Sequence, residues 1–173
     1  MLRSCILFAF SLLLVSLVPA KADNWTLAEQ RERNRQHHED MLAHPEVEVL
    51  PSGLGFQQIT EGNGAKPSEL SSVQVYYRGR LLNGDTFDAQ LPPDEPIEFI
   101  LHQVIPGWQE GLKRMREGGS ARLHVPPQLA YGAQSMPGIP PFSLLIFDIE
   151  LVRVIGFRRD EPAQSQDATS PLH

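Results

Sequence analysis

The residues of this sequence that could form a functional site are aromatic and aliphatic side chains next to proline and glycine turns. They are Tyr77, Phe87, Trp108, Tyr131, Ile139 and Phe147. Any one of them alone is more typical of an ordinary core position. Together they could line an apolar pocket that excludes water around a bound ligand.

Motifs for bond-making chemistry are missing from the sequence. It contains neither a Gly-x-Ser-x-Gly turn nor a His-Glu-x-x-His pair. The glycines of residues 62–64 are followed by Lys66-Pro67, which predicts a turn instead of a phosphate-binding loop. His102 and His124 are the only histidines in the strand-rich part of the chain, and we expect both at the surface.

One polar stretch, His37-His38-Glu39-Asp40, contains side chains of the kinds that bind divalent metals, and His44 follows seven residues after His37. A solvated helix face is the favoured interpretation, because nothing in the sequence shields or orients these imidazoles. We therefore predict no metal site and no cofactor.

An apolar pocket without nucleophiles can still catalyse a reaction that makes no bond. Rotation about an X-Pro peptide bond is such a reaction, and its barrier of about 18–20 kcal/mol comes from lost amide resonance. The twisted amide is less polar than the planar one, so a pocket that excludes water favours the transition state over the solvated ground state.

Strand patterns surround these residues. Apolar and polar side chains alternate over residues 73–82, 97–101, 121–125 and 145–151. The first of these patterns meets Asn83-Gly84, a strong signal for a hairpin turn. One helical pattern interrupts them, with Trp108, Leu112 and Met115 on one face. The sequence therefore predicts an α+β domain, in which an antiparallel sheet wraps around one short helix.

Residues 1–22 predict a secretory signal peptide. Arg3 precedes a mostly apolar run that is too short to span a bilayer, and Ala20-Lys21-Ala22 suits a signal peptidase. Cleavage after Ala22 would direct the chain to the periplasm or outside the cell, without a membrane span. Cys5, the only cysteine, would leave with the signal, so the mature chain could form no disulfide.

Residues 23–46 predict a helical arm. Thr26 and Glu29 form a capping box at the start of a helix over residues 27–43, and Pro45 ends it. The apolar positions of this helix are too few to bury a face. We therefore expect an exposed arm that docks lightly, pairs with a second chain or binds a client. It would be dispensable for catalysis on peptides but contribute to acting on whole proteins. We expect a protein that is a monomer or a weak homodimer.

The remaining composition excludes some partners. Residues 158–173 are polar and lack an apolar pattern, which predicts a disordered tail. The 15 basic residues fall to 13 when Arg3 and Lys21 leave with the signal, against 21 acidic residues, so the formal charge is near −8. Such a charge argues against nucleic acid as a partner.

Four blocks of the sequence resemble the FKBP family of peptidyl-prolyl cis–trans isomerases, and they occur in the order that the family has. They are Val73-Gln-Val-Tyr-Tyr77-Arg-Gly79 with Asn83-Gly84-Asp-Thr-Phe87-Asp88, Val104-Ile105-Pro-Gly107-Trp108-Gln-Glu-Gly111, Val125-Pro-Pro-Gln-Leu-Ala130-Tyr131-Gly132 with Gly138-Ile139-Pro-Pro141, and Leu145-Ile-Phe147-Asp-Ile-Glu150-Leu. Residues 47–54 are similar to the lead-in of secreted bacterial members, the macrophage-infectivity-potentiator group.

This resemblance implies an isomerase domain over residues 47–157 and a role for each site residue. Trp108 would form the pocket floor, while the Ile105 backbone N–H and the Tyr131 hydroxyl would bind substrate carbonyls. Asp88 would polarise the pocket edge. The walls would be formed by Tyr77, Phe87, Ile97, Phe99, Val104, Ile139 and Phe147.

The resemblance also implies partners. Proline-containing polypeptides would be the substrates, and macrolide ligands of the family would compete for the same pocket. Ile97 stands where the family often has an aromatic wall residue, and Met136 stands where a flap histidine is common, so substrate preference stays open. The alternative function is a non-catalytic, proline-recognising chaperone or assembly module with the same fold.

Overall fold

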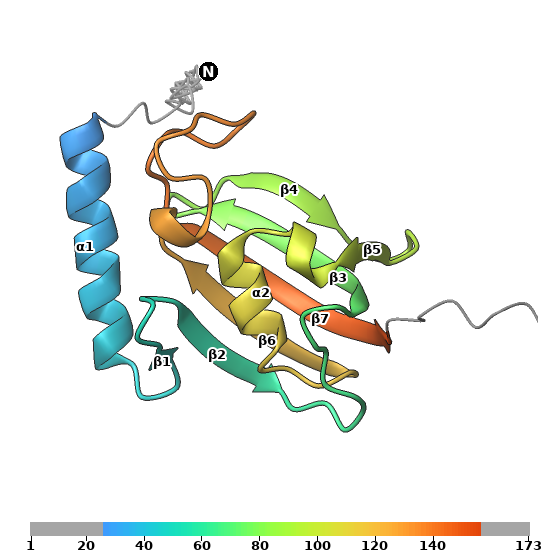
Figure 1. Ribbon diagram of the computed structural model, residues 1–173. Helices are drawn as coiled ribbons and strands as arrows, with labels where there is room; N and C mark the ends of the chain where they lie inside the picture. Colours follow the sequence, from blue (N-terminus) through green and yellow to red (C-terminus); the bar gives the residue numbers. More distant parts are fainter. Residues whose placement is uncertain (1–25, 157–173) are drawn as a thin grey trace, which may run out of the picture.

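The computed structural model describes residues 26–156, which form a curved antiparallel sheet with a short helix across one face (Figure 1). The strands are β1 (Glu48–Val49), β2 (Gly55–Thr60), β3 (Ser72–Leu81), β4 (Thr86–Gln90), β5 (Ile97–Ile100), β6 (Gly119–Val125) and β7 (Leu145–Ile155). Their order in the sheet is β1-β2-β6-β7-β3-β4, and β5 pairs with β3. The predicted α+β fold is confirmed.

The two longest strands, β3 and β7, form the centre of the sheet. They pair antiparallel from Ser72 opposite Ile155 to Leu81 opposite Leu145, with one irregularity after Gln74. Alternate residues on these strands are buried, as the period of two predicts. The predicted strand over 97–101 ends one residue early, because Leu101 begins the 3-10 turn η1 (Leu101–Gln103).

Helix α2 (Pro106–Leu112) packs tightly against one face of the sheet. Pro106 occupies its first turn, where the missing N–H costs nothing. A Cβ atom at Gly107 would lie 2.4 Å from Val125 Cγ1, and one at Gly111 would lie 2.5 Å from Leu123 Cδ1. Two glycines therefore allow the helix to approach β6 closely. Met115, predicted on this helix, is buried in the turn that follows it.

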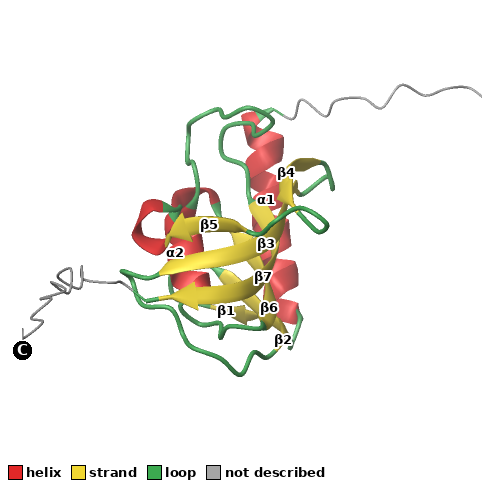
Figure 2. Ribbon diagram, turned by 90° about the vertical axis from the view of Figure 1, so that its right-hand side faces the viewer, coloured by secondary structure: helices red, strands yellow, loops and turns green. Residues whose placement is uncertain are grey.

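Helix α1 (Leu27–Ala43) has the predicted bounds and the predicted capping box. Thr26 Oγ1 accepts from the Glu29 backbone N–H at 3.3 Å, and the Glu29 carboxylate accepts from the Thr26 N–H at 2.8 Å. The helix lies beside the sheet, away from α2 (Figure 2). Most residues of α1 are exposed, as expected, but the helix is docked on the domain along one side, where Gln30 and Met41 are buried at 5% and 2% exposure.

His124 is also placed differently from the prediction. It points to the outer face of β6, but α1 covers it there and leaves it 8% exposed. Nε2 of His37 lies 2.8 Å from Nδ1 of His124. The polar stretch at 37–40 therefore contributes a docking contact, and no cluster of three or more metal-binding side chains occurs between residues 26 and 156.

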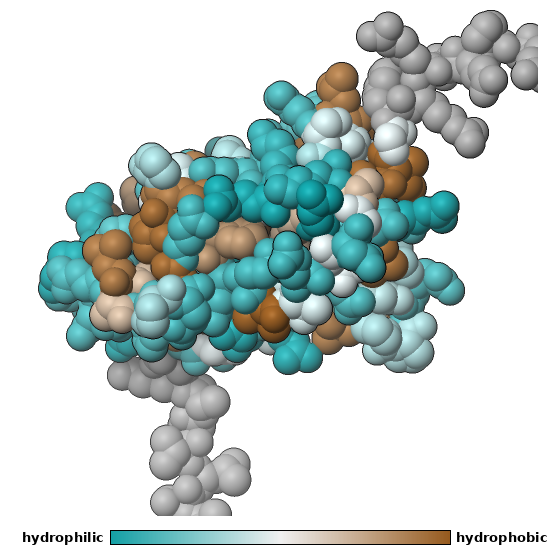
Figure 3. All heavy atoms as spheres, turned by 90° about the horizontal axis from the view of Figure 1, so that it is seen from below, coloured by the Kyte–Doolittle hydropathy of each residue, from teal (hydrophilic) through white to brown (hydrophobic). Residues whose placement is uncertain are grey.

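The face seen in Figure 3 is largely hydrophilic, with small separate apolar patches. No helix within residues 26–156 has the length and apolar character needed to cross a membrane. The predicted signal peptide and the predicted disordered tail, residues 1–22 and 158–173, lie outside the described residues.

Candidate active site

An aromatic pocket of about 330 Å³ opens between the sheet and helix α2. Four strands, η1, α2 and two connecting segments contribute to it, so residues that are far apart in the sequence meet there. Its lining consists of Tyr77, Phe87, Asp88, Phe99, Gln103, Val104, Ile105, Trp108, Tyr131 and Phe147.

Trp108 is the centre of the pocket and is only 4% exposed. Its ring meets three other rings edge to face, with centroid distances of 5.1 Å to Tyr77, 5.6 Å to Phe99 and 5.2 Å to Phe147. Each such pair adds about 0.5–1.5 kcal/mol beyond its burial. The indole plane is therefore held in one orientation before any ligand binds.

Local structure explains how the elements position these rings. Ile105 is the N-cap of α2, and its carbonyl accepts from the Trp108 N–H at 2.9 Å, which places the indole one turn into the helix. A Cβ atom at Gly79 on β3 would lie 2.5 Å from Phe87 Cζ and 2.9 Å from Phe147 Cε1. The glycine in the Tyr77-Arg-Gly79 block thus makes room for two wall residues.

Asp88 and Tyr77 form the main polar contact of the pocket. The Tyr77 hydroxyl donates to Asp88 Oδ2 at 2.5 Å. Burial raises the pKa of Tyr77, and the hydrogen bond to Asp88 raises it further. The phenol therefore stays protonated and keeps the carboxylate fixed at the pocket edge.

Tyr131 also lines the pocket, at the base of the loop over residues 132–142, which we call the flap. Burial raises the pKa of Tyr131, and the nearby charge of Asp88 adds to this rise. Its hydroxyl is therefore a protonated donor at neutral pH. The Phe142 N–H donates to the Gly132 carbonyl at 2.7 Å and closes the base of the flap next to Tyr131.

The structure brings nine of the eleven predicted site residues to this pocket. The two others are Ile97 and Ile139, which do not line it. Ile97 is partly buried against the core, and Ile139 is buried in the core at 6% exposure. Gln103 lines the pocket although it was not predicted. It lies in the 3-10 turn η1, where the alternation of apolar and polar residues no longer indicates which way a side chain points.

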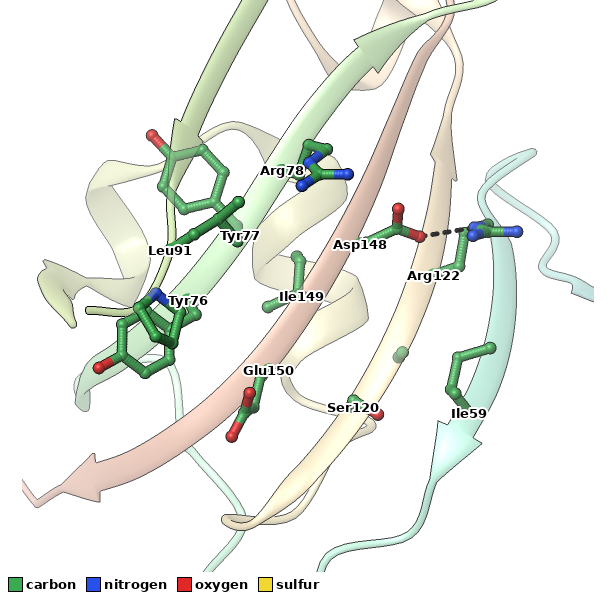
Figure 4. A pocket seen from close by; sticks show the side chains of 12 residues that line it. Ile59, Tyr76, Tyr77, Arg78, Leu91, Ser120, Arg122, Asp148, Ile149 and Glu150 are labelled. Atoms are coloured by element: carbon green, nitrogen blue, oxygen red, sulfur yellow. Dashed lines mark hydrogen bonds and ion pairs between the residues drawn. The ribbon is translucent and has the colours of Figure 1, made fainter. Parts of the chain in front are cut away.

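A second hollow, of about 370 Å³, lies on the outer face of the sheet (Figure 4). There, Asp148 accepts hydrogen bonds from Arg80 and Arg122, each at 2.6 Å. The Asp148 carboxylate partly neutralises the two guanidinium charges. Among the predicted site residues, only Tyr77 borders this hollow. The aromatic pocket is therefore the stronger candidate for a catalytic site.

The chemistry of the aromatic pocket suits an uncharged, apolar group next to a carbonyl. Its floor and walls are rings and aliphatic side chains, and its polar groups are few. A proline ring with its preceding carbonyl has this composition. The pocket would exclude water from such a group while a small number of donors bind the carbonyl oxygen.

Comparison with known proteins gives a consistent result. Residues 63–152 match the model of the family described as FKBP-type peptidyl-prolyl cis-trans isomerase. The isomerase FkpA of Escherichia coli K12 is 39% identical over 141 residues, which cover 82% of this chain and 50% of FkpA. The macrophage infectivity potentiator of Trypanosoma cruzi is 40% identical over 131 residues, which cover 75% of this chain and 67% of that protein.

Solved structures agree with the sequence comparison. The crystal structure of E. coli FkpA superposes with a TM-score of 0.71 at 40% identity, covering 74% of this chain and 60% of the FkpA chain. The chain thus spans about half the length of E. coli FkpA. Because the family model matches more than half of this sequence, the chain belongs to the family of FKBP-type peptidyl-prolyl cis-trans isomerases.

Proposed function

We propose that this protein is a peptidyl-prolyl cis–trans isomerase that accelerates rotation about X-Pro bonds in polypeptides. The observation that carries the proposal is the aromatic pocket, in which Trp108 lies beneath Tyr77, Phe99 and Phe147 while Asp88 is fixed by Tyr77 at the edge. Membership of the isomerase family supports the same reaction.

The pocket residues have two roles: the rings exclude water, and the hydrogen-bond donors bind the substrate carbonyls. The proline ring would stack on the Trp108 indole, between the walls formed by Phe87, Phe99 and Phe147. The backbone N–H of Ile105 and the hydroxyl of Tyr131 would donate to substrate carbonyls. Because the twisted amide has lost resonance and polarity, the dry pocket stabilises it relative to the planar amide in water. The reaction transfers no group and needs no cofactor.

The substrates we propose are proline-containing proteins outside the cytoplasm. The predicted signal peptide over residues 1–22 supports export to the periplasm or beyond, where newly translocated chains must fold. X-Pro isomerisation takes tens to hundreds of seconds without a catalyst, slow enough to limit folding. Macrolide ligands of the family would occupy the same pocket and compete with substrate.

A prolyl-isomerisation assay on a short X-Pro peptide tests this function directly. The purified chain, treated with a chelator, should raise the rate above the uncatalysed one, and a macrolide ligand should abolish the increase. A rate equal to the uncatalysed one, together with retained binding of a proline peptide, would instead establish the non-catalytic recognition module.

A further inference from the structure

Helix α1 contacts the fold through one stripe of its surface. Its members recur at spacings of four, three and four residues, which places them on one helix face: Gln30, Asn34, His37 and Met41. Three of the four are polar. The stripe therefore produces almost no hydrophobic signal, although each of its members contacts or packs against the domain.

The N-terminal half of this stripe binds the end of the flap. Asn34 Nδ2 donates to the Phe142 carbonyl at 2.8 Å. Gln30 Nε2 donates to Ser143 Oγ at 3.2 Å, and Ser143 Oγ in turn donates to the Pro140 carbonyl at 2.7 Å. The Arg31 guanidinium lies 5.4 Å from the centre of the Phe142 ring. Three helix residues thus converge on the segment from Pro140 to Ser143, at the end of the flap.

Phe142 is held in a conformation that it would not adopt unaided. Its φ of 58° lies in the left-handed region, and it is the one non-glycine residue with a positive φ among residues 26–156. Both of its backbone polar groups are used: the N–H donates to Gly132, and the carbonyl accepts from Asn34. Removing the Asn34 donor would leave a partly buried carbonyl without this contact and free the residue to relax.

The strained residue connects directly to the pocket. Gly132, which accepts from the Phe142 N–H, follows Tyr131 in the chain, and Tyr131 lines the pocket. On the other side of the flap, Ile139 exchanges backbone hydrogen bonds of 3.0 and 2.9 Å with Met136 and is buried in the core. Movement of Phe142 would therefore shift Tyr131 at the pocket edge.

We infer that Asn34 and Gln30 of the N-terminal helix are positioning residues of the isomerase, which hold the flap so that Tyr131 faces the substrate. This inference rests on the proposed function. It replaces the expectation that the helix is dispensable for catalysis on peptides, because that expectation rested on the small number of apolar residues in the helix and did not include its polar contacts to the flap.

Substitution of Asn34 gives the sharpest test. Asn34→Asp keeps the size of the side chain but places a second acceptor opposite the Phe142 carbonyl. Gln36→Glu makes the same amide-to-carboxylate change at an exposed position of the same helix and is the matched control. We expect kcat/KM for a short X-Pro peptide to fall roughly fivefold in Asn34→Asp, as for one lost hydrogen bond, and to stay unchanged in Gln36→Glu.

Deuterium uptake of residues 132–143 supplies a second readout that a loss of overall stability would not reproduce. We expect faster uptake there in Asn34→Asp, at a temperature where the rest of the sheet is as protected as in the wild type. Gln30→Met, which removes the donor to Ser143 at similar length, should act in the same direction. The inference is overturned if both variants, folded, match Gln36→Glu in rate and in uptake.

The two readouts also separate this inference from the proposed function. An inactive wild-type chain would refute the isomerase activity and, with it, a role of Asn34 in catalysis. An active wild type, with Asn34→Asp and Gln30→Met both matching Gln36→Glu in rate and in uptake, would leave the activity intact and refute the positioning role alone.

Discussion

At the scale of single residues, Trp108 is the side chain on which the pocket depends most. Its ring supports three neighbouring rings, so its loss would both remove the floor and open a cavity. We expect Trp108→Ala to lower the free energy of unfolding by about 3–5 kcal/mol and to reduce activity more than Asp88→Ala does. Peptide isomerisation by both variants, after circular dichroism has shown them folded, checks this. Full activity in both would contradict the pocket assignment.

The hydrogen bond between Tyr77 and Asp88 can be tested separately. Tyr77→Phe keeps the ring contacts with Trp108 and removes only the hydroxyl that donates to the carboxylate. Hydrogen bonds to charged groups contribute about 1.5–3 kcal/mol, so we expect a loss of stability in this range and a several-fold drop in kcat/KM. Tyr76→Phe, whose hydroxyl donates to the Asp94 carbonyl outside the pocket, is the matched control.

At the scale of elements, the docking of α1 should depend on pH through His37 and His124. Burial lowers the pKa of His37. Burial, together with the neighbouring His37 and Arg122, lowers the pKa of His124 to about 4. Arg80 also lowers the pKa of His124, whereas Asp148 raises it. On the helix, Asp40 raises the pKa of His37 and His38 lowers it.

The direction of the effect follows from these shifts. The docked state favours neutral rings, whereas an undocked helix leaves both histidines in water with pKa values near 6.5. The stabilisation of docking by the neutral histidine pair is therefore fully present above about pH 6.5 and is lost as the pH falls toward 4. Two protonated rings cannot share the 2.8 Å contact.

Deuterium uptake of residues 27–43, corrected for the intrinsic effect of pH, measures this docking. We expect uptake to rise between pH 7 and pH 5 in the wild type and in His44→Gln, whose histidine is exposed at the end of the helix. The rise should be smaller in His37→Gln. Equal pH dependence in all three chains would exclude the histidine pair as its cause.

Most elements were predictable from the sequence because their signals are local. Alternation identified β3 and β7, Asn83-Gly84 identified the hairpin, and the capping box at Thr26 identified the start of α1. The docking of α1 was not predictable, since it depends on polar pairs separated by 87 to 113 residues. From the sequence alone, a helix face composed of glutamine, asparagine and histidine is expected to face solvent, because its distant hydrogen-bond partners are known only from the structure.

The candidate site likewise contains residues that were predictable from the sequence and residues that were not. Nine of its lining residues were predicted, and all of these except Phe99 lie in the blocks that resemble the family. Ile97 and Ile139 were also placed on the wall by that resemblance. Neither lines the aromatic pocket: Ile139 is part of the buried core, and Ile97 packs against it. Gln103 carried no signal, since amide side chains in 3-10 turns are common at ordinary surface positions.

At the scale of the whole molecule, the predicted signal peptide over residues 1–22 determines where the exported chain should begin. We expect the exported protein to start at Asp23, because Ala20 and Ala22 occupy the small-residue positions that a signal peptidase reads. Intact-mass measurement of protein recovered from the periplasm or the medium checks this. A mass that includes residues 1–22 would show that the segment is retained.

The flap is fixed at its base and near its tip, and the segment between the two is exposed. The base is held at Phe142, which bonds to Gly132 and to Asn34, and the Met136–Ile139 pair closes the tip. Side chains at residues 133–135 are exposed, so exchanging them would cost little stability, provided that the backbone keeps the hydrogen bond from Gln134 N–H to the Tyr131 carbonyl. Those three positions form a natural graft site, where recognition side chains can be exchanged next to the catalytic pocket.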